Sequence, residues 1–284
     1  MNRLIYPLLW LMMGHMVTPC NAQTDRVLIH SHNDYEQEAP FYGAYARQVF
    51  SIEADVFAME DGRLLVGHHR SDLTDNRTLE QLYITPIVSS FEANGGRAWR
   101  DSDHRFVLLI DLKTPAPSTL PNIVQLVGAY PAVFDSRVNP LAVQVVISGD
   151  MPSPSAFNDY PPFILFDGRV TTDYTPAQLD RIAFFSGNFR DFSQWTGDEL
   201  LSSADKERLE EVVQAAHTKG KQVRFWATPD GEKSWKALQK LGVDIINTDR
   251  IDACVDYFNA VKSEKKEGAV RQSFEKKVPV MVAR

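Results

Sequence analysis

Short runs of β-branched and aromatic residues alternate along this chain with segments whose apolar residues recur at helical spacing. The β-rich runs predict eight strands, over residues 27–31, 50–56, 106–112, 142–147, 163–166, 182–185, 222–226 and 243–246. The segments between them predict helices over residues 40–48, 78–94, 120–130, 175–179, 203–218 and 233–241. No internal repeat or low-complexity linker interrupts this alternation.

Strands that alternate with helices indicate parallel βαβ units. The chain has 284 residues, and a domain over residues 23–262 comes close to the roughly 250 residues of one (β/α)₈ barrel. We therefore predict an α/β fold built as a single TIM barrel, with its site at the carboxyl-terminal ends of the strands. Residues 263–284 are highly charged at their start, and we expect them to be the frayed end of the last helix followed by a loosely held extension.

Residues 1–22 differ from the rest of the chain. A basic start is followed by a long apolar stretch and then by small residues before a cleavage point after Ala22. This order is typical of a secretory signal peptide, and the apolar stretch is shorter than a membrane span. Cys20 could instead carry the lipid of a bacterial lipoprotein, but Pro19 stands where a small residue is needed. We expect an exported protein, periplasmic or secreted.

Composition and charge narrow the class further. Hydrophobic residues make up 44% of the chain and charged residues 24%, which is ordinary for a soluble globular protein with a sizeable core. A formal net charge of −7 argues against nucleic acid or an anionic membrane as the main partner. Once residues 1–22 are removed, Cys254 is the only cysteine, so an internal disulfide is excluded.

Paired carboxylates mark the end of the second predicted strand. Glu53 and Asp55 are two residues apart, and the period of a strand puts both on one face. Asp111 and Lys113 repeat this spacing at the end of the third strand. Side-by-side carboxylates in an apolar strand are costly unless a cation offsets their charge. Oxygen ligands favour Ca²⁺ or Mg²⁺ over Zn²⁺, so the pattern predicts one such divalent cation.

Two histidines are candidates for proton transfer. His32 and Asn33 follow the first strand directly and place an imidazole beside an amide oxygen that suits a cation. Asp61 and Gly62 are a hairpin turn signal, and the apolar run after them would bring His68 back over the barrel mouth. One imidazole on each side of a cation suits displacement at phosphorus, because one removes a proton and the other donates one.

Four further side chains are candidates for contacts with the substrate or its phosphate. His30 shares a strand face with His32. Arg224 and Trp226 have the parity that faces the barrel interior, although aromatic packing is a common reason for such a tryptophan. Lys113 lies on the same face as Asp111, and a salt bridge with Lys113 is the alternative to a ligand role for Asp111.

Other functions compete with a phosphodiesterase. His30 and His32 could bind zinc as in an amidohydrolase barrel, but such sites need later histidines, and the second half of the chain contains only His217. Glu53 and Asp111 could be the carboxylate pair of a glycoside hydrolase, which would leave the histidines unexplained. The third alternative is a barrel that binds a phosphorylated ligand without converting it, and only an assay separates that one.

The order of these motifs resembles a known family. Ser-His-Asn at the first strand, Glu-x-Asp at the second, Asp-Gly with an apolar run before a histidine, and then Asp-x-Lys are similar to the phospholipase C-like phosphodiesterases. That superfamily includes the glycerophosphodiester phosphodiesterases and the phosphatidylinositol-specific phospholipases C. The late segments over residues 223–228 and 241–249 are similar to the end of the glycerophosphodiesterase barrel. Within this superfamily, the residues of the early motifs are most similar to those of the altered-inheritance-of-mitochondria protein 6-like branch.

The resemblance implies roles at matching positions. His32 would be a catalytic acid/base with His68 as its counterpart, while Asn33, Glu53 and Asp55 would be metal ligands. Asp111 stands where the family usually has Glu, and His69 where it usually has Asp. The family's His-Arg-Gly is His32-Asn33-Asp34 here, so an arginine that would contact phosphate is missing, and Lys113 or Arg224 would replace it. The substrate implied is a small phosphodiester or a phospholipid-derived molecule.

Overall fold

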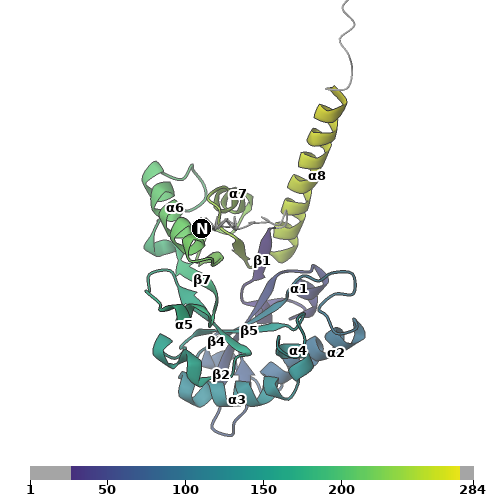
Figure 1. Ribbon diagram of the computed structural model, residues 1–284, viewed down its shortest axis with the longest axis vertical. Coiled ribbons are helices and arrows are strands. Elements are labelled where there is room, and N and C mark those ends of the chain that lie inside the picture. Colours follow the sequence, from purple (N-terminus) through teal and green to yellow (C-terminus); the bar gives the residue numbers. More distant parts are fainter. Residues whose placement is uncertain (1–26, 276–284) are drawn as a thin grey trace, which may run out of the picture.

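Eight parallel strands close into a barrel in the computed structural model, which describes residues 27–275. In chain order they are β1 (Leu28–Ser31), β2 (Ser51–Ala58), β4 (Val107–Leu112), β5 (Gln144–Gly149), β6 (Ile164–Arg169), β7 (Ile182–Asn188), β8 (Val223–Trp226) and β9 (Ile245–Thr248). β1 pairs with β9 on one side and with β2 on the other, which closes the sheet (Figure 1). The predicted barrel is confirmed, and each predicted strand overlaps one of these strands. The predicted signal peptide, including Cys20, lies outside the described residues.

A short hairpin extends β2 beyond the barrel. β3 (Leu64–Val66) runs antiparallel to β2, with Val56 opposite Val66. In the turn, the Arg63 backbone N–H donates to Asp61 Oδ1 at 3.0 Å, and Gly62 has a φ of 85°, which favours glycine. The hairpin predicted from Asp61 and Gly62 is therefore present, and Asp61 is a turn residue.

Helices and helical turns connect the strands. The α-helices are α1 (Tyr42–Ala46), α2 (Thr85–Ala93), α3 (Ala116–Gly128), α4 (Pro131–Phe134), α5 (Pro176–Leu179), α6 (Ser203–Thr218), α7 (Glu232–Lys240) and α8 (Ile251–Glu275). A π-helical turn (Glu80–Ile84) leads into α2, and 3₁₀ turns occur at Asp34–Glu36, Arg70–Asp72, Pro154–Asp159 and Phe189–Asp191. The predicted helix over residues 203–218 matches α6, because Ser202 caps its amino end by accepting the Asp205 backbone N–H at 3.1 Å.

The last helix is the longest. α8 follows β9 directly and continues to Glu275, so the first part of the predicted extension over residues 263–284 is helical. Figure 1 shows α8 projecting away from the barrel. Cys254 on this helix is buried and unpaired. Within residues 27–275, no helix combines the length and the apolar character needed to cross a membrane.

The barrel interior changes from apolar to polar along the strands. Its lower part is a cluster around Val107, Leu109, Val146, Phe184 and Ile245. Residues two positions apart on a strand lie on the same face, so the next inward-facing residues form a second level of the barrel interior. These residues, here called the polar layer, are His30, Glu53, Asp111, Ser148, Asp167, Ser186, Arg224 and Asn247. Every barrel strand contributes one member, and the layer lies on the carboxyl-terminal side of the apolar cluster.

A cavity of about 440 Å³ opens at the other end of the barrel. Its lining includes Leu28, Gln144, Leu165 and Ile182, which lie near the starts of their strands. The polar layer and the cavity are therefore at opposite ends. The acid/base candidates belong to the polar end, where barrel enzymes build their sites.

Candidate active site

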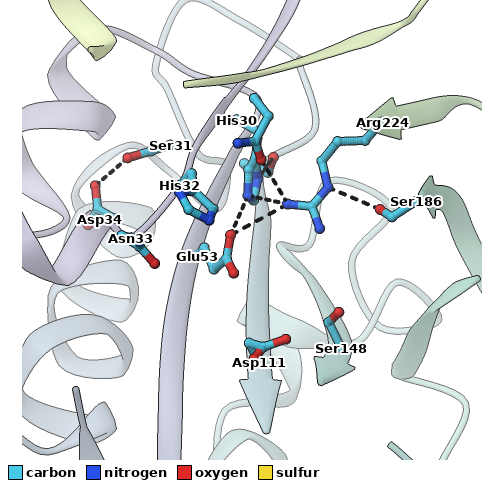
Figure 2. Close-up of polar contacts among 12 residues, drawn as sticks. His30, Ser31, His32, Asn33, Asp34, Glu53, Asp111, Ser148, Ser186 and Arg224 are labelled. Carbon is cyan, nitrogen blue, oxygen red and sulfur yellow. Dashed lines mark hydrogen bonds and ion pairs between the residues drawn. The ribbon is translucent and has the colours of Figure 1, made fainter. Parts of the chain in front are cut away.

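A buried aspartate shapes the loop after β1. Asp34 is fully buried and accepts hydrogen bonds from Ser31 Oγ at 2.8 Å, from the Phe41 backbone N–H at 2.6 Å and from the Tyr83 hydroxyl at 3.0 Å. Burial raises the pKa of this carboxyl, although these three bonds oppose the rise. Asn33 has a φ of 46°, in the left-handed region, so the turn depends on these anchors. Figure 2 shows the Ser31–Asp34 contact beside His32 and Asn33.

His32 forms a pair with a residue from the far end of the chain. His32 Nδ1 lies 2.7 Å from Oδ1 of Asp249, the residue that directly follows β9. Burial disfavours the charged imidazole, but the hydrogen bond to Asp249 and the negative charges of Glu53 and Asp249 raise the pKa of His32 above its usual value. The side chain is 28% exposed. Because Nδ1 is engaged, Nε2 is the nitrogen left for proton transfer.

His68 forms a second pair of the same kind. It follows β3, and its Nδ1 lies 3.1 Å from Asp55 Oδ2, so the hairpin brings it to the barrel mouth as predicted. The Tyr35 hydroxyl lies 2.8 Å from the same Asp55 oxygen, 3.2 Å from His68 Nδ1 and 2.9 Å from Asn33 Oδ1. Burial and the Asp55 charge raise the pKa of this phenol, so it stays protonated and donates to one of the two oxygens. His69 instead begins the turn Arg70–Asp72, where its backbone N–H donates to Asp72.

The Lys113 ammonium group lies between the carboxylates of Asp55 and Asp111. Its Nζ lies 2.8 Å from Asp55 Oδ2 and 2.7 Å from Asp111 Oδ2. Asp55 and Asp111 are direct partners in the parallel β2–β4 register, which places their side chains next to each other. Burial alone would lower the pKa of Lys113, but both carboxylates raise it above its usual value. The salt bridge between Lys113 and Asp111, which is the alternative to a ligand role for Asp111, is present and includes Asp55.

Glu53 belongs to a buried network with His30 and Arg224 (Figure 2). His30 Nε2 lies 2.8 Å from Glu53 Oε2, and Arg224 Nη1 lies against the same two atoms, while His30 Nδ1 lies 2.7 Å from Ser51 Oγ. Burial and the Arg224 charge lower the pKa of His30 to about 4. Burial disfavours ionised Glu53, yet the His30 hydrogen bond and the nearby positive charges hold its pKa well below the usual range. Glu53 therefore stays charged and His30 neutral near pH 7.

Arg224 is fixed inside the barrel on several sides. Its Nε donates to Ser186 Oγ at 3.0 Å, and its Nη2 lies 3.3 Å from Asp167 Oδ2. The side chain is 4% exposed, so it faces the interior as its parity predicts, but its donors are already engaged within the protein. Trp226, two residues further on, is 40% exposed at the end of β8. Packing in the core is therefore not its role.

The predicted metal ligands have the type of ligand atom, oxygen, that a hard cation prefers. Glu53, Asp55 and Asp111 supply carboxylate oxygens on adjacent strands, and Asp55 Oδ1 is buried without a hydrogen-bond partner, as a ligand atom would be. In the part of the chain that the structure describes, however, no group of three or more His, Cys, Asp or Glu side chains is arranged to hold a metal. Lys113 and Arg224 are the ion-pair partners of these carboxylates.

Three residues of the site had no role predicted from the sequence: Asp249, Tyr35 and Asp167. Asp249 directly follows a strand, and Asp167 lies near the end of one, so their placement at the carboxyl-terminal strand ends was a usable signal. Tyr35 had no such signal. Its contacts depend on the loop that Asp34 holds, and no local pattern predicts that loop.

Comparison with known families gives two matches along the chain. Residues 19–153 match the AIM6-like phosphodiesterase domain, and residues 222–251 match the glycerophosphoryl diester phosphodiesterase family. The first match contains His32, Glu53, Asp55, His68 and Asp111. The second contains Arg224 and Asp249. The two matches therefore cover both ends of the site.

Known proteins agree with these matches. The chain is 26% identical over 274 residues to altered inheritance of mitochondria protein 6 homolog from Arthroderma benhamiae, covering 81% of this chain and 83% of the relative. It is 27% identical to altered inheritance of mitochondria protein 6 from Eremothecium gossypii, covering 79% and 68%. The barrel is also similar to the crystal structure of a glycerophosphodiester phosphodiesterase from Parabacteroides distasonis, with a TM-score of 0.54, 14% identity, and coverage of 82% and 97%.

The fold, the two family matches and the relatives that match most of the chain agree with one another. The resemblance inferred from the sequence motifs is thus confirmed at the level of the family. The chain belongs to the glycerophosphodiester phosphodiesterase and phospholipase C-like phosphodiesterase superfamily, in its AIM6-like branch.

Proposed function

We propose that this protein hydrolyses phosphodiesters and uses His32 and His68 as its acid/base pair. The observation that carries the proposal is that each imidazole is bonded through Nδ1 to a carboxylate, His32 to Asp249 at 2.7 Å and His68 to Asp55 at 3.1 Å. A carboxylate at Nδ1 fixes the ring and its tautomer, so that Nε2 exchanges protons with the substrate. One imidazole removes a proton from the nucleophile, and the other donates a proton to the leaving oxygen.

We further propose that Glu53, Asp55 and Asp111, with Asn33, hold one divalent cation, Ca²⁺ or Mg²⁺. When bound, such an ion neutralises the phosphodiester and lowers the pKa of the attacking water or hydroxyl. The protein's own residues perform the remaining work. Lys113 would add a positive charge beside the phosphate, in place of the family's missing arginine.

The remaining candidates divide into two roles. Arg224 and His30 hold Glu53 in position rather than contacting the phosphate, because their polar atoms are engaged inside the barrel. Trp226 is exposed at the mouth and is our candidate for contact with the alcohol part of the substrate. The substrate class is a small phosphodiester or a phospholipid-derived molecule, and we place the reaction in an exported protein. A hydroxyl next to the phosphate would attack first and give a cyclic phosphate, and otherwise water attacks directly.

Two observations disfavour the zinc amidohydrolase alternative. Both ring nitrogens of His30 have partners, Nδ1 with Ser51 and Nε2 with Glu53 and Arg224, so neither is free to bind zinc. His217, the one later histidine, pairs with Asp244, which precedes β9. It therefore lies toward the amino-terminal end of the barrel, away from the polar layer.

A panel of phosphodiesters, assayed with and without EDTA, tests the proposal. The variants are His32→Ala and Glu53→Ala, and the matched control is His217→Ala, which removes a histidine from a carboxylate pair outside the site. We expect hydrolysis that EDTA and both site variants abolish and that the control retains. Full activity in EDTA contradicts the cation, and full activity of His32→Ala contradicts the acid/base assignment. A barrel that only binds its ligand would retain binding of the phosphodiester without any turnover.

A further inference from the structure

The loop after β8 contains a carboxylate whose hydrogen bonds converge on the end of β9. Asp230 Oδ1 accepts the Trp235 indole N–H at 2.8 Å and the Thr248 hydroxyl at 2.7 Å. Asp230 Oδ2 accepts the backbone N–H of Asp249 at 2.9 Å. Asp230 thus joins the start of α7 to the residue that binds His32.

Asp249 itself has few other restraints. Its side chain is 58% exposed, and its carboxylate pairs with His32 Nδ1. Its backbone carbonyl accepts from the Gln37 side chain at 3.1 Å, at the protein surface. A solvent-exposed carboxylate can rotate at little cost, so its direction depends on how firmly its backbone is held. The hydrogen bond from the Asp249 N–H to Asp230, at 2.9 Å, is shorter than the one from Gln37 and has a charged acceptor, so it restrains this backbone more strongly.

The same anchor reaches the other partner of the pair. The His32 backbone N–H donates to the Thr248 carbonyl at 3.1 Å, and the Thr248 hydroxyl donates to Asp230. Both His32 and Asp249 are therefore tied to one short stretch at the end of β9. Ala227, in the same loop as Asp230, has a φ of 56°, a strained conformation that persists only where surrounding contacts fix the loop.

We propose that Asp230 is a positioning residue for the reaction, holding the end of β9 so that the Asp249 carboxylate meets His32 Nδ1. This inference rests on the proposed function, because it gives the His32–Asp249 pair a part in catalysis. Asp230 acts through Asp249 and contacts no reacting atom. Outer partners of this kind typically contribute about 10–100-fold to activity or ligand affinity.

A carboxylate with a similar structural role provides a matched control. Asp244 accepts the Val223 backbone N–H at 2.9 Å and pairs with His217 at 2.8 Å. Like Asp230, it ties β8 and β9 together and contacts a backbone amide, but it does so at the amino-terminal ends of the two strands. A purely structural role predicts the same behaviour for the two residues. A positioning role predicts a difference between them.

The experiment compares Asp230→Asn with Asp244→Asn. In Asp230→Asn, the amide can keep one oxygen for Trp235 and Thr248, but it then turns an N–H toward the Asp249 N–H and loses that bond. We expect kcat to fall about tenfold in Asp230→Asn, with KM within about twofold of wild type. Asp244→Asn should lower Tm while it leaves kcat unchanged. Equal losses of kcat in the two variants would overturn the proposal.

A double-mutant cycle tests whether Asp230 acts through Asp249. If it does, Asp230→Asn lowers kcat in wild type but adds no further loss to Asp249→Asn. Independent losses that multiply would contradict the positioning role. If Asp230→Asn fails to fold, Thr248→Val provides a second comparison, because it removes the hydroxyl that donates to Asp230 and that also accepts the Arg250 backbone N–H.

A spectroscopic readout separates this inference from the proposed function. The His32 Nδ1–H proton bonded to Asp249 should give a low-field imidazole resonance that disappears in Asp249→Asn. We expect it to weaken or disappear in Asp230→Asn and to persist in Asp244→Asn, whether or not any substrate is hydrolysed. An unchanged resonance in Asp230→Asn refutes the positioning role. A wild type that hydrolyses no phosphodiester refutes the proposed function alone.

Discussion

His32 and Asp249 are separated by 217 positions in the chain, yet His32 Nδ1 lies 2.7 Å from Asp249 Oδ1. Barrel closure produces this contact, because β1 and β9, the first and last strands, are neighbours in the sheet. The second pair, His68 with Asp55, is formed by a local hairpin instead. Two similar pairs thus arise from one long-range and one short-range structural cause.

Replacement of Asp249 by asparagine should change both the rate and its pH dependence. Asp249 stabilises protonated His32, so its loss lowers the pKa of His32. The limb of the kcat/KM profile that belongs to His32 should therefore move to lower pH, and kcat should fall about 10–100-fold. A full pH profile of wild type and Asp249→Asn measures both effects. A profile that falls in height but keeps both limbs in place would argue that Asp249 does not act on His32.

The Tyr35 hydroxyl should matter more for activity than for folding. Tyr35→Phe removes the group that lies within hydrogen-bond distance of Asn33, Asp55 and His68, so we expect kcat to fall about tenfold. Tyr83→Phe is the matched control, since the Tyr83 hydroxyl donates to Asp34 and contacts none of these groups. It should cost about 1 kcal/mol of stability and leave kcat near wild type. Similar kinetics for the two variants would remove Tyr35 from the site.

Lys113 should stabilise the protein when no divalent cation is bound. Lys113→Met leaves Asp55 and Asp111 without their bridging charge, and we expect a loss of about 2 kcal/mol, since Lys113 is partly exposed and a fully buried pair costs roughly 3–5 kcal/mol to break. Added Ca²⁺ or Mg²⁺ should restore part of this loss. Urea unfolding with and without the ion measures both effects. Lys206→Met removes an exposed pair with Glu210 and should cost no more than about 0.5 kcal/mol. Failure of either ion to stabilise Lys113→Met would count against the cation site.

Buried His30 should make stability depend on pH. The folded protein keeps His30 neutral, with a pKa of about 4, while in the unfolded chain the group gains a proton below pH about 6.5. The stability that neutral His30 contributes to the folded protein is therefore fully present above pH about 6.5. It is lost as the pH falls, and the loss reaches about 2 kcal/mol near pH 5. His30→Gln should reduce this slope. Free energies of unfolding from urea titrations at pH 7, 6 and 5 provide the measurement, and parallel slopes for the two proteins would contradict the prediction.

The sequence alone located much of the site because strand periodicity is a local property. The period of two put Glu53 with Asp55 and Asp111 with Lys113 on shared faces. The structure has Asp111 and Lys113 at the end of β4, with Asp55 beside Asp111 in the neighbouring strand, although β2 continues past Asp55 to Ala58. The turn at Asp61 and Gly62 likewise predicted the hairpin that carries His68. These inferences need only the residues themselves and the rule that barrel sites lie at the carboxyl-terminal strand ends.

The tertiary structure decided which groups bind one another. Lys113 lies between two carboxylates, and Arg224 is enclosed by other members of the polar layer. The sequence had suggested that one of these two residues contacts phosphate. Asp249 received no role from the sequence, because nothing near it in the chain shows that it will lie beside His32. Periodicity determines the face on which a side chain lies, whereas closure of the barrel determines which faces meet. The sequence therefore determined the fold class and the carboxylate clusters, and only the closed barrel decided the partners of each charge.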